Sequence, residues 1–308
     1  MTGLCVCIKG SWRTDVPLRL RSTAQGLQED GRHPVFTVAE WAALHLALGV
    51  RDVLTEQGAA GAVAAPIPVL ALSVAPPPRE PLLREALACG AGAALRVWGR
   101  SWPDDLLSHM EGTADLTAAL AAAASHAIQE WSGGEPLLVL TGDASGDAGH
   151  GCFGALLAHG LRAALVQRVA ALHFRDASWL AVAKLEQGYS QEIVLPSRAV
   201  LTAVPQTIVP RQATLPEWLA SRTATITQRL TDLPLPAAPD TRLRIPVPRV
   251  KRYAVPGSGL SAEQRIQALV NLPHAGGGTV LSAATGVPDQ VETLLSLLRE
   301  HDVLPRAV

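Results

Sequence analysis

The chain has 308 residues, with 26 lysines and arginines against 27 aspartates and glutamates. This near-neutral charge argues against a nucleic-acid-binding protein, which normally carries a basic face. Hydrophobic residues make up 48% of the chain and the net charge is -1, a combination that argues against a disordered chain. The length allows one large α/β domain or two ordinary ones.

Cysteine usage and the N-terminus indicate a cytoplasmic protein. The four cysteines (Cys5, Cys7, Cys89 and Cys152) have neither zinc-site spacing nor the number that a disulfide framework needs, so we expect buried, reduced thiols. The sequence contains no uninterrupted apolar run long enough to cross a bilayer. A strand is expected from Leu4, which leaves no room for a signal peptide. We therefore expect no membrane insertion.

The first half of the chain alternates between expected strands and helices. Strands are predicted at residues 4–8, 68–74, 93–97 and 136–141, and helices at 37–48, 81–90, 116–131 and 151–160. The strands are apolar throughout rather than alternating. This pattern predicts an α/β fold with a doubly wound, mainly parallel sheet that is covered on both faces.

The second half has a different pattern. Strands at 166–173, 179–185, 192–195 and 198–203, with a hairpin turn at Gln187-Gly188, predict an extra small β region. Prolines then become frequent, which predicts an extended arm with one helix near 215–229. Helices at 261–271 and 289–301, with a glycine turn at 276–278 and a strand at 279–282 between them, form a last unit. Because this unit is too small to fold alone, we expect it to pack on another chain.

Two features near strand ends are candidate ligand sites. Lys9 closes the first strand, at the edge where open α/β sheets bind ligands. Gly149-His-Gly151-Cys-Phe-Gly154 is a GxGxxG sequence that opens a helix, where glycines and free amides favour an anion. The motif follows a long loop and lies outside the first strand–helix unit, which argues against a dinucleotide-binding dehydrogenase.

An apolar cluster at residues 215–219 has two alternative interpretations. Leu215-Pro-Glu-Trp-Leu219 follows the proline-rich stretch at the start of an expected helix. The residues either pack against the domain in the ordinary way or lie exposed as an anchor for a partner.

Several segments together resemble the beta subunit of electron transfer flavoproteins. Val6-Cys-Ile-Lys9 resembles the opening strand of that family, and His33-Pro-Val-Phe36 resembles its Asn-Pro-aromatic helix start. Leu83-Arg-Glu-Ala-Leu-Ala-Cys-Gly-Ala91 is nearly the family's Leu-Arg-x-Ala-Leu-Ala-Met-Gly-Ala, and Pro210-Arg-Gln-Ala-Thr-Leu-Pro216 resembles its Pro-Arg-Tyr-x-Thr-Leu-Pro. Together with Leu72-Ser-Val-Ala75 and the loop after Leu137, these motifs agree in order and spacing over residues 4–230.

The resemblance implies an adenine nucleotide alpha hydrolase-like fold and an adenosine-nucleotide site that holds AMP or a second FAD. The site residues that it implies are Cys7, Lys9, His33, Pro34, Val35, Phe36, Val74, Gly142, Asp143, Ala144, Ser145, Gly146, Asp147, Ala148, Gly149, His150 and Gly151. The loop departs from the family's Asp-Gly-Asp-x-x-Gln-x-Gly, because His150 stands in place of the amide and Cys152 in place of a glycine. No catalytic residue and no metal ligand is implied.

The resemblance also implies partners. The redox-active FAD of the family is shared with an alpha subunit, and electrons pass from flavin dehydrogenases to a quinone oxidoreductase or another acceptor. Leu215 stands where the family places a leucine that docks on dehydrogenases, with Trp218 beside it. The implied organisation is a nucleotide-binding domain over 1–230, an arm over 231–260 and a helical cap over 261–308. Two alternatives stay open, a nucleotide-binding module without electron transfer and an NAD-dependent oxidoreductase.

Overall fold

The computed structural model falls into two compact units, Met1–Arg244 and Ile245–Val308. The first unit extends beyond the expected boundary at residue 230, since the Trp102 indole N–H still donates to the Leu233 carbonyl at 2.9 Å. The residues that the structure describes are 3–12, 34–59, 68–103, 114–133, 137–146, 149–205, 211–234, 259–265 and 286–300.

A nine-stranded sheet forms the centre of the first unit, in the order β11-β5-β4-β1-β6-β10-β7-β8-β9. The pairs from β11 to β7 are parallel, and β7-β8 and β8-β9 are antiparallel. The strands are β1 Gly3–Cys7, β4 Val69–Val74, β5 Ala93–Gly99, β6 Leu137–Gly142, β7 Ala164–Arg175, β8 Ser178–Lys184, β9 Ser190–Val194, β10 Arg198–Ala203 and β11 Thr227–Thr231. The mostly parallel sheet with helices agrees with the doubly wound α/β architecture expected from the sequence.

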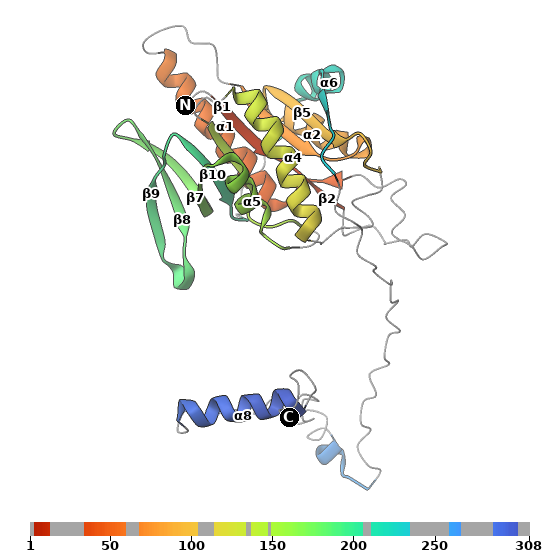
Figure 1. Cartoon of the computed structure of the whole chain (residues 1–308), viewed down its shortest axis with the longest axis vertical. Helices are drawn as coiled ribbons and strands as arrows, with labels where there is room; N and C mark the ends of the chain where they lie inside the picture. The colour runs from red at the N-terminus through yellow and green to blue at the C-terminus, as the bar shows by residue number, and fades with distance from the viewer. Residues whose placement is uncertain are drawn as a thin grey trace. The chain divides into compact units, whose positions relative to one another are not determined.

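Helices cover both faces of the sheet (Figure 1). One face carries α1 (Val38–Ala59) and α2 (Glu80–Ala88), the latter preceded by the short helix η1 (Pro77–Arg79). The other face carries α4 (Ala114–Ser132) beside α5 (Phe153–Leu161). A further helix, α6 (Leu215–Thr223), packs on α2.

Consecutive side chains along the strands point to opposite faces of the sheet, so each face has its own hydrophobic core. On β1, Leu4 and Val6 pack on the α1 and α2 side, whereas Cys5 and Cys7 pack on the α4 and α5 side. Because both faces are covered, β1, β4 and nearly all of β6 are buried along their length. This explains why these strands read as continuous apolar runs in the sequence.

The predicted extra β region continues the same sheet. The first half of β7 pairs with β10 and the second half with β8, and the register shifts between Val169 and Ala171. Arg168 has a positive φ of 57° at this point, and its amide donates to the Thr202 hydroxyl at 3.0 Å. The predicted turn at 187–188 lies in the short helix η2 (Glu186–Gly188) between β8 and β9.

The prediction of one helix over residues 215–229 is wrong for the second half of that range. Helix α6 ends at Thr223, and the chain continues as β11, which pairs with β5 at the sheet edge. Between the end of α6 and the start of β11, Thr225, Ile226 and Thr227 carry β-branched side chains, which disfavour a continued helix. The open edge of β5 gives Thr227–Thr231 a backbone hydrogen-bond partner, which favours a strand over a continued helix.

In the second unit, the structure describes a helical turn at 262–265 and α8 (Val287–Glu300). Val287, Val291 and Leu294 on α8 are exposed, and they repeat at helical spacing as an apolar stripe. The predicted glycine turn and the strand at 279–282 lie outside the described residues. Nowhere in the described part of the chain is a helix both long and apolar enough to cross a membrane.

Candidate functional site

A cavity opens at the carboxyl ends of β1 and β6. The chain passes from β1 through β4 to β5 on one side and then returns to place β6 on the other side of β1. Ligands of open α/β sheets bind at such a point, because the loops after the two strands run in opposite directions. With its open mouth, the cavity has a volume of about 840 Å³.

The cavity has an apolar side and a polar side. The apolar side chains come from β1, β4, α4 and the start of α5, and they are Cys7, Ile8, Leu72, Val74, Leu116, Leu120, Cys152 and Phe153. The polar side comes mainly from the loop after β6, together with Lys9, Glu40, Thr117, Thr141 and His150. Such a cavity suits a ligand with a flat apolar part and a polar or anionic part.

Glu40 connects the end of β1 to the start of α1. The amides of Lys9 and Gly10 donate to Glu40 Oε1 at 2.6 and 2.8 Å, and the amide and hydroxyl of Thr37 donate to Oε2, both at 2.9 Å. Thr37 and Glu40 thereby form a capping box at the start of α1. Glu40 is 6% exposed, and its four donors compensate for the burial of its charge.

Gly10 is required where β1 meets this carboxylate. Its φ is +72°, in the region that side-chain-bearing residues rarely adopt, and a Cβ atom would collide with the buried side chain of Leu82. The close approach lets the Gly10 amide reach Glu40. The path of the backbone after β1 is therefore determined by Gly10 and Glu40 together.

The loop after β6 bends back over the sheet edge. The Asp143 amide donates to the Ala203 carbonyl at 3.0 Å, and the Gly149 amide donates to the Ser145 carbonyl at 3.1 Å. Gly151 has a φ of +64° and leads into α5. The Cys152 side chain does not cap α5, so the amides of its first turn face this loop without a side-chain acceptor from the cap residue.

Burial shifts the pKa of Asp143 in the cavity wall and of Cys5 on the adjoining strand. Burial raises the pKa of the half-buried Asp143 carboxyl above its ordinary value. Burial also raises the pKa of the Cys5 thiol well above its usual range, and the neighbouring Cys7 thiol acts in the same direction. All four cysteines are free, and Cys152 is half-buried rather than buried as expected.

Many of the residues predicted for the nucleotide site line this one cavity. They are Cys7, Lys9, Val74, Gly142, Asp143, Ala144, Ser145, His150 and Gly151. Pro34, Val35, Phe36, Gly146 and Gly149 are not among the lining residues. His33, Asp147 and Ala148 lie outside the described residues.

Residues 34–36 do not line the cavity but pack beside it. The strands β2 (Ser11–Trp12) and β3 (Pro34–Val35) form a small antiparallel sheet, and the Phe36 ring lies 4.6 Å from the Trp41 ring. A Cβ atom on Gly146 would contact Ser11 and Thr37, so the loop after β6 packs against this sheet. Phe36 itself is buried in the core with α1.

Sequence reasoning missed the contributions of α1 and α4. Glu40 had a local signal, the Thr37-x-x-Glu40 capping-box spacing, although the spacing does not reveal that Glu40 also reaches Lys9 and Gly10. Leu116 and Leu120 stand four residues apart on one face of α4. Nothing local distinguishes them from ordinary core leucines.

The predicted contact residues lie exposed on α6. Leu215, Trp218 and Leu219 are 68%, 46% and 50% exposed, and the Arg222 guanidinium lies 5.0 Å from the Trp218 ring centre. Of the two alternatives left by the sequence, the exposed arrangement is the one present in this chain. Arg84 on α2 holds the far end of α6 by donating to the carbonyls of Ser221 and Arg222.

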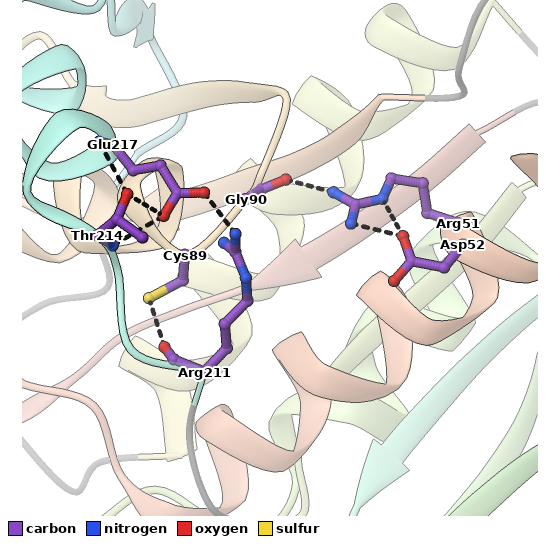
Figure 2. A network of polar contacts seen from close by, with 7 residues as sticks. All are labelled: Arg51, Asp52, Cys89, Gly90, Arg211, Thr214 and Glu217. Atoms are coloured by element: carbon purple, nitrogen blue, oxygen red, sulfur yellow. Dashed lines mark hydrogen bonds and ion pairs between the residues drawn. The ribbon is translucent and has the colours of Figure 1, made fainter.

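A polar network fixes the beginning of α6 (Figure 2). The Glu217 side chain accepts from the amide and hydroxyl of Thr214 and pairs with the Arg211 guanidinium. The Thr214 amide, followed by the Arg211 guanidinium, lowers the pKa of Glu217 to about 2. The Cys89 thiol donates to the Arg211 carbonyl at 3.4 Å, which ties the network to the end of α2.

His45 on α1 holds the same segment. Its Nε2 accepts the Arg211 amide at 2.9 Å, which requires a neutral ring nitrogen at that position. Burial lowers the pKa of His45 below its ordinary value. The charged groups of Arg51, Asp52, Arg211 and Glu217 line the surface hollow beside it.

Within the described ranges, no three His, Cys, Asp or Glu side chains come together as a metal site would require. Comparison of the chain with protein-family models and with curated protein sequences finds no match.

We predict that Glu40→Gln destabilises the first unit by about 1–3 kcal/mol, because one amide oxygen cannot accept all four donors and buried amides are left unpaired. The free energy of unfolding in urea measures this. Glu80→Gln is the matched control, because Glu80 forms only an i,i+4 ion pair with Arg84, and such a pair contributes about 0.3–0.5 kcal/mol. Equal losses in the two variants would contradict the role of Glu40.

We predict that His45 makes stability fall in mild acid. The folded pKa is lowered below the ordinary value of about 6.5, so its contribution is complete above that pH and is lost as the pH falls below it. His45→Gln keeps an acceptor for the Arg211 amide but does not titrate. Between about pH 7.5 and pH 5.5, the wild type should lose more unfolding free energy in urea than the variant, and parallel losses would refute the prediction.

Proposed function

We propose that this chain is a nucleotide-binding electron-carrier subunit equivalent to the beta subunit of an electron transfer flavoprotein, with the adenine nucleotide alpha hydrolase-like fold of that family. The observation that carries the proposal is the cavity at the ends of β1 and β6, which is lined by residues that the resemblance implied. Proteins of this sheet type bind nucleotides at this point of the topology. No match to a known family supports the proposal independently.

The shape and chemistry of the cavity fit an adenosine nucleotide. Leu72, Val74, Leu116 and Leu120 offer an apolar wall to a flat ring. The loop after β6 and the first turn of α5 offer backbone amides to a phosphate.

The charges of the cavity also permit a phosphate. Lys9 supplies a cation at the cavity wall. The Glu40 carboxylate is already engaged by four donors, which reduces its repulsion of an anion. These residues would bind and orient AMP or a second FAD.

The FAD shared with an alpha subunit would supply the redox chemistry when it is bound. This chain would contribute the nucleotide site, the contact surface with the alpha subunit and a docking surface on α6. The apolar stripe of α8 (Val287, Val291 and Leu294) is a candidate surface for packing on the alpha subunit. Electrons would pass from a flavin dehydrogenase to a downstream acceptor, such as a quinone oxidoreductase.

A second candidate is a nucleotide-binding module without electron transfer. Its specific support is the loop, in which His150 and Cys152 line the cavity in place of the amide and the glycine of the family. These residues change the side chains that would contact a ligand. An NAD-dependent oxidoreductase has less support, because the GxGxxG follows β6 rather than β1.

We predict that the chain, copurified with its alpha partner and then denatured, releases adenine nucleotide. Two FAD per heterodimer would indicate a second FAD in this cavity, and one FAD with one AMP would indicate a structural AMP. Lys9→Met should remove the nucleotide of this chain and leave the shared FAD, because a charge-assisted contact contributes about 1.5–3 kcal/mol, or tenfold or more in Kd.

Lys184→Met is the matched control, because Lys184 is exposed at the end of β8. It should release the same nucleotides as the wild type. Release of NAD(H) would favour the dehydrogenase alternative, and a nucleotide without flavin would favour the module. If the heterodimer releases no nucleotide that belongs to this chain, the proposed nucleotide site is refuted.

We predict that Leu215→Ala slows electron transfer from the partner dehydrogenase while leaving the flavin content unchanged. An exposed apolar anchor typically contributes about 1–2 kcal/mol, so KM for the dehydrogenase should rise about tenfold. Val194→Ala, which truncates a 62% exposed side chain on β9, is the control and should leave KM unchanged. Unaltered kinetics in Leu215→Ala would exclude a docking role.

A further inference from the structure

A buried arginine in the sheet has no hydrogen-bond partner among the residues that the structure describes. Arg96 on β5 is 7% exposed, and its Nε atom is fully buried without a hydrogen bond. No hydrogen bond or ion pair joins its side chain to any other residue within the described ranges. A buried N–H donor without an acceptor is unfavourable, and Nε is the Arg96 atom in this state. The described residues provide no acceptor for it.

A second unpaired donor stands beside it. Ser73 on β4 is 1% exposed, and within the described ranges its hydroxyl oxygen also has no hydrogen-bond partner. Ser73 and Arg96 are register partners in neighbouring parallel strands. Strands lie about 4.8 Å apart in a sheet, and paired residues point to the same face. One acceptor group at this place can therefore receive hydrogen bonds from both side chains.

The pair lies on the opposite face of the sheet from the cavity. Leu72 and Val74 pack toward α4 and line the cavity. Ala71 and Ala94 pack on the α1 and α2 side, and alternation places Ser73 and Arg96 on that same side. Helix α2 packs on β4 and β5 there and begins just after the end of β4. Its N-terminus adds a positive potential near this edge of the sheet.

One acidic group at the start of α2 is already engaged. The Glu80 carboxylate accepts from Arg84 at 2.6 Å. The Arg79 guanidinium lies 4.5 Å from the Trp12 ring centre.

We propose that Arg96 and Ser73 form an oxyanion-binding site on the α2 face of the sheet, for a phosphate or a carboxylate group. The planar guanidinium matches two oxygens of such a group, and a serine hydroxyl donates to either oxygen. The low exposure of both residues limits the site to a small group rather than a whole nucleotide. The anion comes either from solution or from a carboxylate of the partner subunit.

Phosphate is the probe for this site. Thermal unfolding of the wild-type chain is followed as potassium phosphate replaces potassium chloride at constant ionic strength, with potassium acetate as a second series. The expected result is a saturable rise of several degrees in Tm with phosphate, because a ligand that binds only the folded state stabilises it. The general stabilising effect of phosphate salts does not saturate, which separates it from binding.

Arg96→Met should abolish the saturable rise, and in chloride its Tm should equal or exceed that of the wild type, because an unpaired buried charge is removed. Ser73→Ala should raise the phosphate concentration that gives the half-maximal rise in Tm about tenfold, which corresponds to about 1.4 kcal/mol of binding free energy. Arg175→Met, which removes an exposed arginine from the end of β7, should respond like the wild type. Identical responses of the wild type and Arg96→Met would overturn the proposal.

The heterodimer distinguishes the two sources of the anion. A phosphate response that persists in the complex indicates an anion from solution. A response that is lost in the complex, together with greater heterodimer affinity of the wild type than of Arg96→Met, indicates a carboxylate of the partner. In the chain without its partner, Lys9→Met should keep the phosphate response, so that a failure of the nucleotide site and a failure of this site are distinguishable.

Discussion

The carboxylate of Glu40 connects the parts of the molecule on which the candidate site depends. Through four donors it joins the end of the central strand β1 to the first turn of α1. In doing so it fixes the backbone of Lys9 and Gly10 at the point where the sheet topology reverses. A charged side chain is tolerated in this buried position because each oxygen accepts two hydrogen bonds.

The two faces of strand β4 carry different groups, because its side chains point alternately to one face and the other. On one face, Leu72 and Val74 form the apolar wall of the cavity beneath α4. On the other face, the residue between them, Ser73, lies with Arg96 near α2. A strand that is buried on both faces can therefore serve two separate sites, because consecutive side chains point in opposite directions.

Helix α6 combines a fixed base with an exposed apolar surface. Its first turn is held by Arg211, Glu217 and His45, and its last turn by Arg84 on α2. The side chains of Leu215 and Trp218 are left exposed. A preorganised anchor of this kind loses little conformational entropy on binding, which favours a contact function for this helix.

Much of the α/β architecture follows from the amino-acid sequence alone. Long apolar strands separated by amphipathic helices predicted the parallel sheet, because burial on both faces removes the alternation of polar residues. The glycine-rich loop and Lys9 indicated the edge of the sheet where the cavity lies, since the loops of parallel strands meet there. Only the tertiary structure decided that Thr227–Thr231 form a strand, because an edge of β5 was open to pair with it. It also decided the roles of Glu40 and Arg96, since Glu40 accepts from the Lys9 amide 31 positions away and Arg96 is the register partner of Ser73, 23 positions away. A local pattern carries no record of such neighbours.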